Sequence, residues 1–90
     1  MFTPETKARG KRFTQVRLRE GYSIEQVDAF VERCIIELAR GPAAQLAPED
    51  VQNVRFHAVR LQKGYDMGEV DAYLDYVTAL LTELRGTQPS

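Results

Sequence analysis

The sequence contains one unit twice. Shifting the chain by 43 residues aligns residues 12–38 with residues 55–81 without a gap, and eleven of these 27 positions are identical. The two segments read RFTQVRLREGYSIEQVDAFVERCIIEL and RFHAVRLQKGYDMGEVDAYLDYVTALL. Repetition at a fixed offset is typical of a supersecondary unit that buries its apolar face against a neighbouring copy. The sequence therefore predicts a fold made of two similar halves.

The chain of 90 residues is too short for more than one ordinary domain. We therefore predict a single domain over residues 1–90 that holds both copies. The first repeat is assigned to residues 3–40 and the second to residues 47–85. A link over residues 41–46 joins them, and residues 86–90 form a frayed tail.

Each copy carries a signal for the start of a helix. Ser23 and Asp66 are favoured N-cap residues, and Gln26 and Glu69 follow three positions later, which is the spacing of a capping box. The preceding tyrosine suits a hydrophobic staple, and the glycine before it suits a sharp turn. The complete helix-start motif consists of Gly21, Tyr22, Ser23, Gln26, Gly64, Tyr65, Asp66 and Glu69.

Apolar residues then recur at alternating steps of three and four, which predicts two amphipathic helices that end at Gly41 and Gly86. Helices of about three heptads are marginal alone in water, so they must pack. We expect Val31 and Leu74 to meet across the pair. The helix-pairing seam consists of Ile24, Val27, Val31, Cys34 and Leu38 in the first copy and Met67, Val70, Leu74, Val77 and Leu81 in the second.

The segments before the helices have a different pattern. Residues 16–18 and 59–61 alternate apolar and polar side chains, which predicts short extended arms lying over an apolar surface. Further upstream, prolines suit short helices that begin at Thr3 and Ala47.

Two pairs of opposite charge recur at the same separation in both copies. Arg17 with Asp28, and Arg60 with Asp71, are therefore candidates for ion pairs that brace each arm against a helix. Solvated surface charges are the alternative interpretation.

Together these patterns predict an all-α fold. Two arm-plus-helix repeats pair their long helices as a short coiled-coil-like pseudo-dimer, with short extended segments before each helix. The link is long enough for parallel or antiparallel helices. Pairing within one chain is favoured by the tether, while pairing between two chains stays open.

The repeated block resembles a known family. The run G-Y-D-M-G-E-V-D-A-Y-L-D, residues 64–75, and its weaker copy in the first half are similar to the N-terminal domain of the DivIVA family, the bacterial cell-pole and division-site scaffolds. The resemblance covers nearly all of both repeats, as in a tandem-repeat protein. It implies parallel helices and pre-helix loops that cross.

The family resemblance also implies a membrane contact, made by an exposed apolar residue with a basic neighbour. The family has an aromatic residue there, whereas this chain has leucine. We expect the two leucines to be partly packed against the helices, and membrane binding to be weak and salt-sensitive. The candidate membrane or partner contact consists of Arg17, Leu18, Arg19, Arg60, Leu61 and Lys63.

No catalytic or metal-binding pattern emerges. Cys34 falls on the helix seam, which suits a small core residue, and a single cysteine allows no internal disulfide. His57 aligns with Thr14, so the shared architecture does not depend on a histidine. We therefore predict no enzyme activity, no cofactor and no metal.

Charge separates two interpretations of the function. Residues 1–22 hold six basic and two acidic side chains, whereas the whole chain has a net charge of −1. We predict a non-enzymatic interaction module of the DivIVA-domain type, linked to bacterial cell division or polar growth. The alternative is a small nucleic-acid-binding protein that uses the basic arm from Lys7 to Arg19.

The expected partner is an unidentified protein, and no nucleic acid is expected in the main interpretation. Weak contact with an anionic membrane and self-association stay open. The chain has no apolar run of about 20 residues and no signal-peptide pattern, so we expect it in the cytoplasm, or peripherally at the inner face of the membrane.

Overall fold

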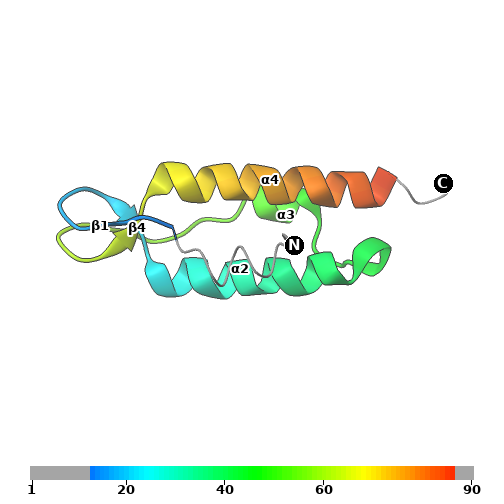
Figure 1. Ribbon diagram of the computed structural model, residues 1–90, viewed down its shortest axis with the longest axis horizontal. Helices are drawn as coiled ribbons and strands as arrows, with labels where there is room; N and C mark the ends of the chain where they lie inside the picture. The colour runs from blue at the N-terminus through cyan, green and yellow to red at the C-terminus, as the bar shows by residue number, and fades with distance from the viewer. Residues whose placement is uncertain (1–12, 87–90) are drawn as a thin grey trace.

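The computed structural model describes residues 13–86, in which two long helices extend from a small β-sheet at one end (Figure 1). Both helices begin at the sheet and run in the same direction. The elements are β1 (Gln15–Val16), β2 (Gly21–Tyr22), α2 (Ile24–Ala39), the 3-10 helix η1 (Gly41–Ala43), α3 (Pro48–Gln52), β3 (Ala58–Val59), β4 (Gly64–Tyr65) and α4 (Met67–Gly86).

The sheet is formed by exchange of strands between the copies. Its order is β1-β4-β2-β3, and every neighbouring pair is antiparallel. The first strand of each copy therefore pairs with the second strand of the other copy. In the centre, Tyr22 lies opposite Tyr65, so the two pre-helix segments cross.

The predicted all-α, coiled-coil-like fold is wrong. The described part of the chain contains a four-stranded antiparallel sheet, and α3 adds a third α-helix to the two long ones. The alternation in residues 16–18 and 59–61 did indicate extended backbone, but such backbone has N–H and C=O groups that need partners. Strands of the other copy supply those hydrogen-bond partners. An extended arm that lay on a helix would lack them.

Both long helices begin beside their cap residues. Ser23 Oγ accepts a hydrogen bond from the Gln26 N–H at 3.3 Å. Asp66 Oδ2 accepts one from the Glu69 N–H at 3.0 Å. The short helix α3 has Ala47 as its N-cap and Pro48 at its first position, whereas Thr3 lies outside the described residues.

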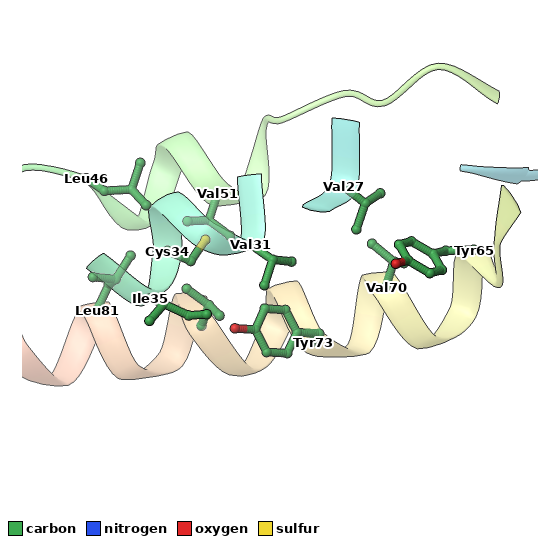
Figure 2. Close-up of a cluster of buried hydrophobic side chains, with 11 residues drawn as sticks. Val27, Val31, Cys34, Ile35, Leu46, Val51, Tyr65, Val70, Tyr73 and Leu81 are labelled. Carbon is green, nitrogen blue, oxygen red and sulfur yellow. The ribbon is translucent and has the colours of Figure 1, made fainter. Parts of the chain in front are cut away.

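The hydrophobic core joins α2, α3, α4 and the sheet (Figure 2). Most of the seam is buried in it, while Ile24, Leu38 and Leu74 are half-buried at its edge and Met67 is half-buried at the start of α4. Tyr73, only 7% exposed, takes the buried position that we assigned to Leu74. The full set is Val27, Val31, Cys34, Ile35, Leu46, Val51, Tyr65, Val70, Tyr73, Val77 and Leu81.

The core is wider than a coiled-coil seam for a physical reason. Leu46 and Val51, from the link and α3, are almost fully buried and pack with the long helices. A helix that packs against several elements buries a broader stripe than one that packs against a single partner. Ile35 and Tyr73 lie on that broader stripe, outside the a/d positions.

Candidate functional site

Gly21 and Gly64 lie where the two copies cross. A Cβ atom on Gly21 would be 2.8 Å from the Tyr65 carbonyl oxygen and 3.2 Å from the Gly64 carbonyl carbon. A Cβ atom on Gly64 would be 3.0 Å from the Tyr22 carbonyl oxygen. We expected these glycines to form sharp turns, but the structure uses them for close backbone approach. This approach holds the two pre-helix loops together at one end of the molecule.

The cap residue and the first turn of α4 bind both backbone groups of one residue in the first copy, the C=O and the N–H of Thr14. The Asp66 N–H donates to the Thr14 carbonyl oxygen at 2.8 Å, and the Thr14 N–H donates to Glu69 Oε1 at 2.7 Å. The Thr14 hydroxyl adds a hydrogen bond to Glu69 Oε2 at 2.6 Å. One residue of the first arm is thus held by the cap and the first turn of the other copy's helix.

The start of α2 holds the second arm in the same way. The Ser23 N–H donates to the His57 carbonyl oxygen at 2.8 Å, and the His57 N–H donates to Gln26 Oε1 at 2.6 Å. The Gln26 and Glu69 side chains therefore bind the opposite copy. In a capping box they would accept the backbone N–H of their own cap residue, but the Ser23 and Asp66 N–H groups donate to carbonyl oxygens of the opposite copy. His57 contributes its backbone here, as the alignment with Thr14 suggested.

Aromatic rings fill the space beneath the crossing. Each phenylalanine before an arm packs between two rings of the opposite copy, in tilted or edge-on geometries that suit aromatic pairs. The ring pairs are Phe13–Tyr65, Phe13–Tyr73, Tyr22–Phe56 and Phe30–Phe56, with centroids 5.2, 5.6, 5.4 and 5.9 Å apart.

The tyrosines at the crossing reach the opposite helices. The Tyr65 hydroxyl donates to Asp28 Oδ1 at 2.8 Å, and the Tyr22 hydroxyl donates to Asp71 Oδ1 at 3.0 Å. Burial, together with the hydrogen bond to Asp71, raises the pKa of Tyr22. The phenol is thus held protonated as the donor of this bond.

The predicted ion pairs are replaced by these tyrosine contacts. Among the described residues, no ion pair joins Arg17 to Asp28 or Arg60 to Asp71. The arginines lie beyond the strands, in the exposed loops, whereas each aspartate faces a tyrosine of the other copy. Repeated spacing left an ion pair with arginine and a solvated charge as alternatives, whereas each aspartate accepts a hydrogen bond from a tyrosine hydroxyl.

The two loops that follow β1 and β3 each contain an exposed leucine. Leu18 is 88% exposed and Leu61 is 76% exposed, and Figure 1 shows both loops at the same end of the molecule. Our expectation that these leucines pack against the helices is wrong. The loops extend beyond the sheet, so the helices are out of reach. We call residues 17–20 the first loop, residues 60–63 the second loop, and the two together the loop end.

Cations surround the exposed leucines. The loop end contains four basic side chains and one carboxylate, all of them in exposed residues. One of the cations is engaged, because Arg19 Nη2 lies 2.6 Å from Asp66 Oδ1. The charged residues are Arg17, Arg19, Glu20, Arg60 and Lys63.

Other sequence candidates lie away from the loop end. Cys34 is fully buried in the core, and burial raises the pKa of its thiol to about 12, so the reactive thiolate is suppressed. Within residues 13–86, no group of three or more His, Cys, Asp or Glu side chains is placed to hold a metal ion. Four of the six basic residues in the arm proposed for nucleic acid, which runs from Lys7 to Arg19, lie outside the described residues.

No helix in the described part of the chain combines the length and apolar character needed to cross a membrane. No protein-family model, curated protein or solved structure matches the chain.

Proposed function

We propose that the chain is a non-enzymatic interaction module of the DivIVA-domain type, linked to bacterial cell division or polar growth, whose loop end contacts an anionic membrane surface. The observation that carries the membrane contact is the joint exposure of Leu18 and Leu61 among basic side chains. A protein partner, still to be identified, would bind elsewhere on the helical surface.

The energetics favour reversible binding. Full burial of a leucine side chain contributes about 1.5–3 kcal/mol, and each cation close to an anionic surface contributes about 1 kcal/mol. Loss of free movement on binding offsets part of this sum. The loop end is therefore expected to bind anionic membranes moderately, with a strong dependence on salt, and to bind neutral ones poorly.

Co-sedimentation with vesicles tests the membrane contact. We expect binding to vesicles that contain phosphatidylglycerol, and little binding to pure phosphatidylcholine. The double variant Leu18→Ser, Leu61→Ser should lose most of the binding to the anionic vesicles. Ile36→Ser is the matched control, because Ile36 is also exposed, at 53%, but lies on α2 in its C-terminal half.

Two outcomes contradict the proposal. Wild-type protein that stays in the supernatant with anionic vesicles would exclude the loop end as a membrane contact. Equal binding by the leucine double variant and by Ile36→Ser would show that the attraction is a general charge effect. A salt-dependent shift of DNA by the intact chain would instead favour the nucleic-acid alternative.

A further inference from the structure

The two loops are related by the repeat, yet their charges differ. Arg17 and Leu18 align with Arg60 and Leu61, so this part of each loop is the same. The next two positions change from Arg19-Glu20 in the first loop to Gln62-Lys63 in the second. The cap residue that each loop approaches changes as well, from Asp66 at the start of α4 to Ser23 at the start of α2.

Asp66 holds the first loop. Its Oδ1 atom lies 2.6 Å from Arg19 Nη2, while its Oδ2 atom accepts the Glu69 N–H at 3.0 Å and its own N–H donates to the Thr14 carbonyl oxygen. The Asp66 side chain is only 19% exposed, whereas the Arg19 side chain is 67% exposed. The carboxylate is thus fixed at a helix N-terminus, which favours negative charge, and it is the arginine that is drawn toward it.

Within residues 13–86, the second loop has no ion pair equivalent to that between Arg19 and Asp66. Ser23 is an uncharged cap, and Gln62 stands where the first loop has its bound arginine. A hollow lies between this loop and the start of α2, lined by Ser23, Ile24, Glu25, Val59, Gln62 and Lys63, so a carboxylate shares the hollow with Lys63 without pairing with it. Neither Arg60 nor Lys63 forms an ion pair with another of the described residues.

We propose that the two loops contact an anionic membrane unequally. The second loop makes the leading contact through Arg60, Leu61 and Lys63, while Asp66 withholds the Arg19 cation of the first loop from lipid phosphates. This inference rests on the proposed membrane contact and adds a specificity-determining residue, Asp66, that lies outside the loops themselves.

A double-mutant cycle on vesicles of phosphatidylglycerol and phosphatidylcholine tests the restraint. Arg19→Gln and Asp66→Ser each install the residue that the other copy has, and serine is a good N-cap, so α4 keeps its start. We expect Arg19→Gln to weaken binding about fivefold in the Asp66→Ser background, because a free cation near the surface contributes about 1 kcal/mol. In the wild-type background the loss should be smaller than twofold.

The cycle separates the restraint from a general charge effect. A general effect of removing the Asp66 negative charge would strengthen binding equally whether or not Arg19 is replaced, so it cancels in the cycle and only the restraint leaves a difference. Equal losses on Arg19→Gln in the two backgrounds would overturn the inference. A second comparison addresses the leading loop: Arg60→Gln should weaken wild-type binding about fivefold, more than Arg19→Gln does. Equal effects of those two changes would also overturn it.

Failure of the inference differs from failure of the membrane proposal. If wild-type protein binds the vesicles and the cycle is additive, only the unequal contact is refuted. If neither the wild-type protein nor Asp66→Ser binds, the membrane contact and the inference fall together. Circular dichroism melting of each variant checks that it is folded.

Discussion

Tyr73 and Phe30 occupy equivalent positions in the two copies, and they differ by one hydroxyl group. The Tyr73 hydroxyl is buried and has no hydrogen-bond partner among the described residues, and burial raises its pKa to about 12. A buried hydroxyl without a partner costs about 1–3 kcal/mol. We therefore predict that Tyr73→Phe raises the free energy of unfolding by about 1 kcal/mol, measured by urea denaturation.

Tyr65→Phe is the control for that prediction. The Tyr65 hydroxyl donates to Asp28, so its removal should lower the free energy of unfolding by about 2 kcal/mol. Stabilisation by both changes would show that the crossing gains nothing from its phenol–carboxylate bonds.

Glu37 predicts a pH dependence. Its carboxylate accepts the Gln45 N–H at 2.7 Å, and this hydrogen bond holds the pKa of Glu37 below its usual value of 4.5. A lowered folded-state pKa adds stability above about pH 4.5, and this stability is lost as the pH falls through the folded-state value. Glu37→Gln should therefore lower the urea midpoint at about pH 7, and the difference from wild type should shrink at about pH 3. An equal difference at both pH values would contradict this.

At the scale of elements, the crossing of β2 and β4 depends on the absence of side chains at Gly21 and Gly64. Alanine at either position brings its Cβ atom within 3.0 Å of a carbonyl oxygen that the sheet keeps in place. We predict that Gly21→Ala or Gly64→Ala lowers the free energy of unfolding by about 2–3 kcal/mol.

Gly68 offers the matched control for the crossing. It lies in the first turn of α4, where an added Cβ atom would meet only the Asp66 side chain, at 3.3 Å. Alanine favours a helix over glycine, so Gly68→Ala should leave the urea midpoint unchanged or raise it. If Gly21→Ala and Gly64→Ala were tolerated as well as Gly68→Ala, the strands at the crossing would have to separate readily.

Local signals account for the elements that could be predicted. The N-caps, the prolines and the apolar period act over three or four residues, and they placed both long helices and α3 correctly along the chain. The strands are only two residues long, so their alternation was too short to indicate pairing. The aspartates were candidates for ion pairs within a copy and the N3 side chains for capping boxes, but the partners of both lie in the other copy.

For the whole molecule, strand exchange makes the two halves interdependent. We predict that insertion of a protease site between Pro42 and Ala43, both exposed, allows cleavage of the link without separation of the halves. The cleaved protein should melt at a lower temperature that rises with protein concentration, because association has become bimolecular.

The uncleaved protein is the control for the link. Its melting temperature should not depend on concentration if the pairing occurs within one chain. Halves that elute separately after cleavage, each with helical circular dichroism, would show that the copies fold independently and that the exchanged strands contribute little.

The sequence alone determined the duplication, the start of each long helix, the end of α2 and the residues that both copies share. These features are encoded locally, by side chains a few positions apart. Only the tertiary structure decided that each strand pairs with a strand of the other copy. Pairing within a copy would satisfy the same backbone N–H and C=O groups, so the sequence does not distinguish the two arrangements. That choice sends the loops beyond the sheet, exposes Leu18 and Leu61, and brings Arg19 against Asp66. The candidate membrane contact therefore depends on contacts between residues more than forty positions apart, which no local pattern encodes.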